Sequence, residues 1–428
     1  MANDVHRPAE ELSIADRRWV DEAFFLVFLL LAFIGVTPFK STDVLAEQMG
    51  AAVQTGAGDS LRQICYLGIF TLIIIQALRH RGRKIIQALP LVLLGLLCWC
   101  FVSALWSMEP SVTVRRAGLA TVLVFSAFLG VRSVGAERAL VLWRWVLLLV
   151  LIVNLISVKF VPAAVHQAGE LDPALVGNWR GVYGHKNIAG SVAAMTALLF
   201  LFSPSRSFWG KAFDLLGVAA SIFFLIGTHS KSSMGLLVIA LVAGAIYRLA
   251  WRREIDRSIA LVSVCLVLLG IAVFATADST VLKRVFDDPA SFTGRAEIWK
   301  AEIAYIIDHP LFGSGFGTFS NTGKASPLAH YVGDWVTSAN HGHNGYLQLL
   351  VTVGGIGFIL AVISLVLQPI IGFWRREHVG FKSVLFALFV FLILHNLMET
   401  DFLEGDGVAW VGFLLLLAML RDVDEVRP

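Results

Sequence analysis

The sequence predicts an all-α integral membrane protein with about 12 transmembrane helices, and two observations support this fold class. Hydrophobic residues make up 57% of the 428 residues and charged residues only 15%, with a mean hydropathy of +0.75. Soluble domains usually carry about a quarter charged residues. Apolar runs of about 17 to 25 residues, long enough to cross a bilayer, recur between short polar links. We therefore expect residues 1–428 to form a single polytopic membrane domain.

The apolar runs set the order of the expected helices. A charged stretch precedes the first run without a small-residue cleavage site, so that run is interpreted as an uncleaved first helix. The runs lie near residues 23–39, 61–78, 86–106, 117–131, 139–159, 188–203, 212–228, 233–250, 258–277, 344–371, 381–398 and 406–420.

Lys and Arg in the short loops predict the orientation, because cytoplasmic loops of membrane proteins carry an excess of both. Arg79–Lys84, Tyr247–Arg257 and Trp374–Lys382 are basic, and each follows an even-numbered helix. The link over residues 41–60 has no Lys or Arg, and Glu399–Gly407 is purely acidic. The basic loops and both termini are therefore expected in the cytoplasm, with the other two segments outside.

Two outer loops, residues 160–187 and 278–343, are longer than loops that merely connect helices. The second is expected to be a large loop on the outer side, with an amphipathic helix lying on the membrane surface over residues 294–310. Its apolar side chains recur at helical spacing: Trp299, Ile303, Ile306 and Ile307. "GSGFGTF" (Gly313–Phe319) has Thr318 in place of the third glycine of a dinucleotide-binding loop, and therefore predicts a turn-rich loop.

Polar residues gather on the side that the orientation places outside. Five segments carry them: Asn178–Gly190 (NWRGVYGHKNIAG), Thr228–Met234 (THSKSSM), Thr293–Trp299 (TGRAEIW), His341–Asn344 (HGHN) and His395–Asp401 (HNLMETD). The convergence of five separate segments predicts a polar site at this face. The net charge of +3 is too small to indicate nucleic-acid binding.

Four cations in these segments form a candidate phosphate-binding cluster: Arg180, Lys186, Lys231 and Arg295. Guanidinium groups pair bidentately with phosphate oxygens, and Lys adds compact positive charge. The alternative is that each is an ordinary interfacial cation at a helix end. Four of them on the less basic side, next to Gly and Asn, favour the phosphate interpretation.

His341 and His343 have three interpretations. In the first, the segment is a helix cap, in which Asn340 or Asn344 accepts hydrogen bonds from free backbone N–H groups. In the second, an imidazole acts as a general base near neutral pH. In the third, the two rings bind a metal, which is disfavoured because no Cys or nearby carboxylate completes the ligand set. Which of the two histidines would be the base stays open.

Further polar residues are candidates for binding the acceptor or for orienting the reacting groups: Asn187, Asn344, His395, Glu399 and Asp401. For the last three the alternative is a capped helix end.

Taken together, GVYGHKNIAG, THSKSSM, GRAEIW, HPLFGSGFGTF and HGHNGYLQLLVTVGGIGF resemble the O-antigen ligase and polysaccharide polymerase superfamily, particularly its exopolysaccharide polymerases. The resemblance covers roughly residues 175–402. Family members usually carry Arg where this chain has Lys231, which puts bidentate phosphate binding there in doubt but not the charge.

The resemblance implies a bacterial inner-membrane glycosyltransferase that acts on the periplasmic side without a nucleotide sugar, cofactor or metal. Residues 278–343 would then form a large periplasmic loop. It would transfer a glycan from undecaprenyl diphosphate to an acceptor hydroxyl on a glycan or glycolipid. Arg180, Lys186, Lys231 and Arg295 would bind the diphosphate, and His343 would activate the hydroxyl with His341 beside it. Membrane lipids and other polysaccharide assembly proteins are the further expected partners.

Three alternatives to polymerisation remain at this stage. An O-antigen ligase would transfer finished polymer to lipid A core in lipopolysaccharide biosynthesis, and the HGHNGYL pattern favours a polymerase over it. A secondary transporter would place its polar groups near the bilayer midplane at broken helices, whereas this chain gathers them at one face. A purely structural membrane subunit is the third.

Overall fold

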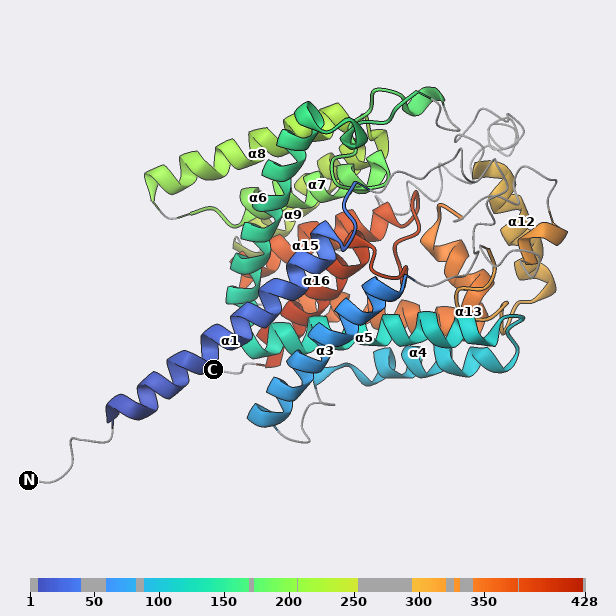
Figure 1. Ribbon diagram of the computed structural model, residues 1–428, viewed down its shortest axis with the longest axis horizontal. Helices are drawn as coiled ribbons and strands as arrows, with labels where there is room; N and C mark the ends of the chain where they lie inside the picture. The colour runs from blue at the N-terminus through green and yellow to red at the C-terminus, as the bar shows by residue number, and fades with distance from the viewer. Residues whose placement is uncertain are drawn as a thin grey trace, which may run out of the picture.

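The computed structural model describes residues 7–39, 59–81, 88–168, 173–205, 207–252, 295–320, 327–331, 342–375 and 377–425. Its elements are α1 (Arg7–Ile34), α3 (Ser60–Arg81), α4 (Leu91–Val102), α5 (Pro110–Val134), α6 (Ala136–Phe160), α7 (Lys186–Phe202), α8 (Phe208–Thr228), α9 (Lys231–Arg252), α12 (Arg295–Asp308), α13 (Gly345–Ala361), α14 (Gln368–Trp374), α15 (Val379–His395) and α16 (Val408–Glu425) (Figure 1). Apart from one isolated bridge between Val165 and Trp179, regular structure in these ranges is helical. The helix expected over residues 258–277 lies outside them.

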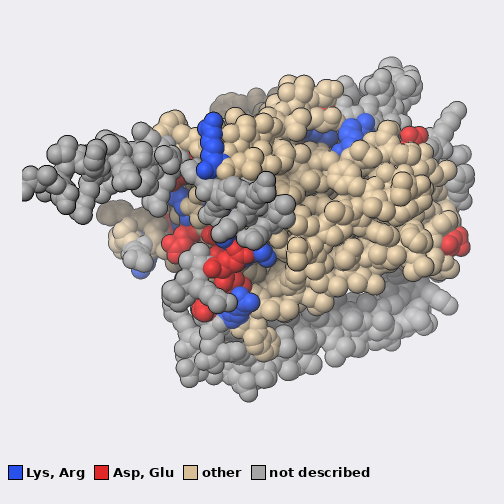
Figure 2. Space-filling view, turned by 90° about the horizontal axis from the view of Figure 1, so that it is seen from below, with Lys and Arg blue, Asp and Glu red and all other residues tan. Residues whose placement is uncertain are grey.

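Several of the described helices are long and apolar enough to cross a membrane. They are α3, α5, α6, α8, α9 and the segment Gly345–Trp374, while α4, α7 and α15 are apolar but shorter. Figure 2 shows a face whose surface is largely uncharged, with most of its charged side chains near one end. These features support an integral membrane protein. The count of 12 helices and the side that faces the cytoplasm stay predictions.

Helix ends that the orientation rule places on one side do meet in the structure. The chain after α1 pairs with the segment before α7, since Phe39 N donates to Val182 O at 3.0 Å. The end of α15 meets the start of α13, where Gly345 N donates to Asn396 O at 2.8 Å. We call the end of the bundle where these segments lie the site end. At the opposite end, two ion pairs join helices to the end of α16. Lys382 near the start of α15 pairs with Asp424, and Arg132 near the end of α5 pairs with Asp422.

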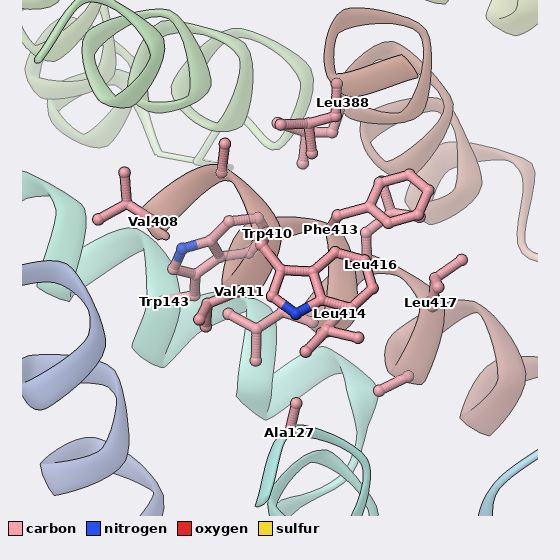
Figure 3. Packing of buried hydrophobic residues seen from close by; sticks show 14 of the residues in the cluster. Ala127, Trp143, Leu388, Val408, Trp410, Val411, Phe413, Leu414, Leu416 and Leu417 are labelled. Atoms are coloured by element: carbon pink, nitrogen blue, oxygen red, sulfur yellow. The ribbon is translucent and has the colours of Figure 1, made fainter. Parts of the chain in front are cut away.

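The core is centred on α16, which contacts α5, α6, α7, α14 and α15. Trp410 on α16 and Trp143 on α6 are fully buried, and the Trp410 ring stacks on Phe413 with ring centroids 6.2 Å apart (Figure 3). A helix that is apolar on all sides is stable only when it is surrounded by other helices or lipid. The unbroken apolar run of α16 therefore fits its central position.

The helix expected over residues 344–371 is not continuous, which corrects the sequence prediction. Gly354 interrupts α13 with φ +67° and ψ −175°, and a π-helix over Val362–Leu367 joins α13 to α14. The segment that begins at Pro310 packs against the helix at this interruption, where Gly355 N donates to Pro310 O at 2.8 Å. A Cβ on Gly354 would lie 2.2 Å from Leu311 O. Only glycine allows the two backbones to approach so closely.

"GSGFGTF" is a turn-rich loop, as expected. Its backbone is bound to α13, because Ser314 N donates to Val351 O at 2.8 Å and Gly315 N donates to Thr352 O at 3.0 Å. Trp106 Nε1 donates to Phe312 O at 3.1 Å from the end of α4. These contacts fix the loop against the start of the interrupted helix.

The expected amphipathic helix exists as α12, but its protein-facing side differs from the predicted stripe. The buried residues are Ile298, Trp299, Ala301, Glu302 and Tyr305. Ile303 is 44% exposed and Ile307 is 73% exposed. Two of the four predicted apolar positions thus point away from the protein, and they remain compatible with a helix that rests on a lipid surface.

Candidate active site

A series of polar side chains in contact with one another links the ends of four helices at the site end. His343 Nδ1 lies 3.1 Å from Glu399 Oε2, and the other carboxyl oxygen of Glu399 accepts a hydrogen bond of 2.6 Å from Asn187 Nδ2. Asn187 Oδ1 in turn accepts from Ser230 Oγ at 3.2 Å. These contacts therefore run from His343, directly before the cap of α13, through Glu399 in the loop after α15, to the starts of α7 and α9.

The local sequence before α13 explains the position of His343. Asn344 caps α13, and its Oδ1 accepts from the backbone N–H groups of Tyr346 and Leu347. His343 adopts a left-handed backbone conformation with φ +51°, which is uncommon for a residue with a side chain and recurs at functional sites. Its side chain is one third exposed, whereas Glu399 is mostly buried. The carboxylate thus holds the ring while part of the ring remains accessible.

The contact with Glu399 favours one tautomer of His343. If Nδ1–H donates to the carboxylate, the lone pair of Nε2 is free to accept a proton from another molecule. This is the arrangement found in carboxylate–histidine pairs of enzymes, in which the carboxylate orients the base and stabilises its charged form. The pair is therefore chemically suited to general-base work.

Two further histidines accept hydrogen bonds from backbone N–H groups at the start of α7. His185 Nδ1 accepts from Asn187 N at 3.2 Å, and His166 Nε2 accepts from Lys186 N at 3.2 Å. The two rings meet edge to face with centroids 5.5 Å apart. Burial lowers the pKa of His185 to about 4, so its ring is neutral at neutral pH and Nε2 carries the proton. The Nε2–H group of His185 can therefore donate a hydrogen bond to an anion at the N-terminus of α7, where a helix favours negative charge.

The four predicted phosphate ligands have different surroundings. Arg180 is 2% exposed and donates from Nε to Ala163 O at 2.8 Å, so it braces the loop before α7. Lys186 is partly exposed at the first position of α7, and Lys231 is exposed at the first position of α9. Arg295 is the first residue of α12, and its side chain lies outside the described residues. Lys186 belongs to the His185–Asn187 segment, Arg180 Nη1 donates to Gly184 O at 3.4 Å, and Lys231 follows Ser230, which donates to Asn187 Oδ1. The joint phosphate role of the four stays a prediction.

His395 and Asp401 form a second histidine–carboxylate pair, in addition to the pair of His343 and Glu399. His395 Nδ1 lies 2.6 Å from Asp401 Oδ2, and the His395 ring stacks on Phe391. Asn396 Oδ1 accepts from the N–H groups of Asp401 and Phe402. These contacts fold the loop after α15 into a compact turn that carries Glu399. Of the three residues predicted at this helix end, only Glu399 contacts His343.

α12 is fastened to the segment that precedes His343. Trp299 Nε1 donates to Gly342 O at 2.8 Å. Glu302 is fully buried, and among the described residues neither of its carboxyl oxygens has a hydrogen-bond partner. A Cβ on Gly342 would lie 1.9 Å from Glu302 Oε1, so the carboxyl group contacts the backbone next to His343. Burial raises the pKa of Glu302 to about 8, which keeps the group protonated at neutral pH.

Sequence reasoning missed part of this cluster. His166, His185, Ser230 and Glu302 carry no signal strong enough to separate them from ordinary polar loop residues, although His185 precedes a helix start in the way of a cap. His341 lies outside the described residues, so the choice between it and His343 rests on the contacts of His343 alone.

The fold and the site together define a polytopic helical membrane protein with a histidine–carboxylate site at one end of the bundle. The family model described as O-antigen ligase matches residues 216–362, about a third of the chain, and confirms the predicted resemblance to the O-antigen ligase and polymerase superfamily. The match points to a membrane glycosyltransferase of that type. No curated protein matches the chain significantly.

The matched range contains Lys231, Arg295 and His343. Arg180, Lys186, Asn187 and Glu399 lie outside it. The structure therefore adds the partners of His343 from segments on both sides of the family match.

Proposed function

We propose that the protein is a bacterial inner-membrane glycosyltransferase that transfers a glycan from undecaprenyl diphosphate to an acceptor sugar hydroxyl on the periplasmic face. The reaction it carries out is polymerisation of repeat units of an exopolysaccharide or another surface polysaccharide. The observation that carries the proposal is the contact at 3.1 Å between Nδ1 of His343, which lies in the range that matches the O-antigen ligase family, and Glu399, which lies beyond that range.

His343 removes the proton from the acceptor hydroxyl through Nε2 as the oxygen attacks the anomeric carbon of the donor. A new glycosidic C–O bond forms, the bond from the anomeric carbon to the diphosphate oxygen breaks, and undecaprenyl diphosphate leaves with the electron pair. Direct displacement inverts the anomeric carbon. Glu399 stabilises the imidazolium ion that forms on His343.

The diphosphate is a good leaving group once its charge is neutralised. Lys186 and the neutral His185 lie at the start of α7, where the helix dipole also favours an anion. Lys231 and Arg295 begin α9 and α12 and supply further positive charge. Arg180 supports the same loop from inside the protein.

The test is reconstitution of the purified protein with a lipid-linked repeat unit. We expect a ladder of products that lengthens with time, and a deletion strain whose surface glycan is reduced to a single repeat unit. Unligated lipid-linked polymer in the deletion strain would identify a ligase instead. Uptake of a labelled solute by proteoliposomes without glycan extension would overturn the proposal in favour of transport.

A further inference from the structure

The carboxyl group of Glu302 is a buried ionisable group that takes no part in the reaction described above. Its side chain on α12 is 0% exposed, and among the described residues neither carboxyl oxygen has a hydrogen-bond partner. A buried polar group without a partner costs free energy, and the cost is largest when the group is charged. The role of this carboxyl group must therefore come from the atoms that it contacts.

Glu302 contacts the backbone directly before the proposed base. A Cβ on Gly342 would lie 1.9 Å from Glu302 Oε1 and 3.0 Å from Oε2, so the whole carboxyl group lies against this glycine. Trp299, about one turn earlier on the same face of α12, donates from Nε1 to Gly342 O at 2.8 Å. Two side chains of α12 thus hold one glycine, the first where a Cβ would lie and the second at the carbonyl oxygen.

The helix that carries these two side chains is itself held against α13. A buried apolar cluster joins the two helices: Ala301 and Tyr305 of α12, Phe319 and Leu328 of the chain that follows it, and Val351 of α13. Glu302 lies between the two α12 members of this cluster in sequence. The carboxyl group therefore has a fixed position relative to the helix that His343 precedes.

The backbone of His343 depends on support from both sides. Its φ of +51° is uncommon for a residue with a side chain, and such a conformation persists only where the surrounding structure holds it. Asn344 supplies that support on one side as the cap of α13, and the held Gly342 supplies it on the other. A displaced Gly342 would move the His343 ring relative to Glu399, and a misplacement of about 1 Å can cost about 10²-fold in rate.

We propose that Glu302 is a positioning residue for His343: its buried carboxyl group holds the Gly342 backbone against α12 and so keeps the base in reach of the acceptor hydroxyl. The proposal rests on the proposed transferase function for the role of His343 as a base. Glu302 contacts no substrate and transfers no proton in the reaction.

Ionisation of Glu302 would release this contact. Burial raises the pKa of Glu302 to about 8, so the group is uncharged at neutral pH. Among the described residues, the ionisable side chains on the neighbouring turns of α12 and on the segments packed against it are Glu297, Lys300, Tyr305, Tyr331, His343 and Tyr346. None of them forms a hydrogen bond with Glu302. An ionised carboxylate would gain stability only from water, which draws it away from Gly342.

The experiment measures the rate of glycan transfer from a lipid-linked donor by the purified full chain at two pH values. A base that acts in its neutral form loses activity toward acid, so His343 does not account for a loss toward alkali. We expect the wild-type rate at about pH 9 to be about tenfold below that at about pH 7, because the uncharged fraction of Glu302 falls to about one tenth. In Glu302→Gln, whose amide cannot ionise, the ratio of the two rates should be close to one. A tenfold loss in this variant as well would overturn the proposal.

Two further variants separate the contact from the charge of the helix. Glu297→Gln removes a partly exposed carboxylate from the same helix and should keep the wild-type ratio of rates. A flattened pH profile in this control would contradict the assignment to Glu302. Glu302→Asp is too short to reach Gly342 in the same way, and should lower kcat about tenfold at neutral pH without raising the KM for the donor. Wild-type kcat in this variant would also count against the positioning role.

Hydrogen–deuterium exchange of the backbone amides of residues 342–347 tests the contact without turnover. Relative to Glu302→Gln at the same pH, the wild-type exchange rate should rise about tenfold from about pH 7 to about pH 9, as the ionised fraction rises from about one tenth to about nine tenths. This rise in a protein that never extends a glycan would overturn the proposed function alone. Glycan transfer without the rise, and with parallel pH profiles, would overturn the positioning role alone.

Discussion

His343 Nδ1 lies 3.1 Å from Glu399 Oε2, so two residues 56 positions apart form a histidine–carboxylate pair at the junction of α13 and the loop after α15. The Glu399→Gln variant tests the pair directly. Its amide oxygen still accepts from Asn187, but it no longer stabilises a charged imidazole. We expect turnover to fall by about 10² to 10⁴-fold, with an unchanged melting temperature. Wild-type turnover in this variant would contradict a role for the pair.

The His343→Ala variant removes the proposed base. General-base catalysis contributes about 10² to 10⁴-fold in rate, and we expect a loss of that size in glycan transfer from a lipid-linked donor. His229→Ala is the matched control, because His229 is exposed, caps α8 and also has a left-handed backbone with φ +50°. Transfer at the wild-type rate by a well-expressed His343→Ala protein would eliminate His343 as the base.

Glu302 predicts a pH dependence of stability. Its pKa in the folded protein is raised to about 8 from an ordinary value of 4.5, so the folded state retains a proton that the unfolded state releases between these values. The contribution of Glu302 to stability is complete below pH 4.5, and it is lost as the pH rises to about 8, by at most about 1.4 kcal/mol per pH unit.

We expect the melting temperature of wild-type protein to fall more steeply between pH 5.5 and pH 8.5 than that of Glu302→Gln, whose amide has no proton to release. These two pH values span most of the window between 4.5 and about 8. Parallel melting curves would show that the Glu302 carboxyl group is ionised in the folded protein.

Gly354 predicts a large loss of stability on substitution. Its φ and ψ angles fall in a region that is essentially restricted to glycine, and a Cβ there would meet Leu311 O at 2.2 Å. Gly354→Ala should therefore destabilise the protein by about 1–3 kcal/mol or more, measured by thermal unfolding in detergent. Gly95→Ala in α4 is the control, since nothing lies within 4 Å of the added Cβ. It should be neutral or slightly stabilising.

The surroundings of the cations separate structural from ligand-binding roles. Arg180→Lys should lower the melting temperature, because the buried guanidinium donates to Ala163 O and a Lys cannot reproduce its planar set of donors. Lys231→Gln and Arg295→Lys should instead raise the KM for the lipid-linked donor without a change in melting temperature. Turnover that is unchanged at every donor concentration would argue against a diphosphate role for the last two residues.

Local sequence was sufficient to predict most of the helices. Apolar runs of bilayer length located α3, α6 and α16 to within a few residues, because hydrophobic length and periodicity are properties of a continuous segment. The motif HGHN also predicted a cap by Asn340 or Asn344, and the structure shows Asn344 in that role, since a cap depends on residues only two or three positions away.

Relationships between distant segments could not be derived in this way. Glu399 was one of several candidate orienting residues in the sequence, and only the packing of α13 against the loop after α15 places it on His343. The interruption at Gly354 likewise depends on the segment that begins at Pro310, and the burial of Arg180 depends on its contact with Ala163.

The sequence by itself determined the helical membrane class and the polar segments of the site end, and it offered His341 and His343 as candidates for the base. The tertiary structure decided which of those polar groups touch and that Arg180 is buried. The physical reason is that hydrophobic periodicity and capping act over a few residues, whereas ion pairs and close backbone contacts depend on how the helix ends meet in space.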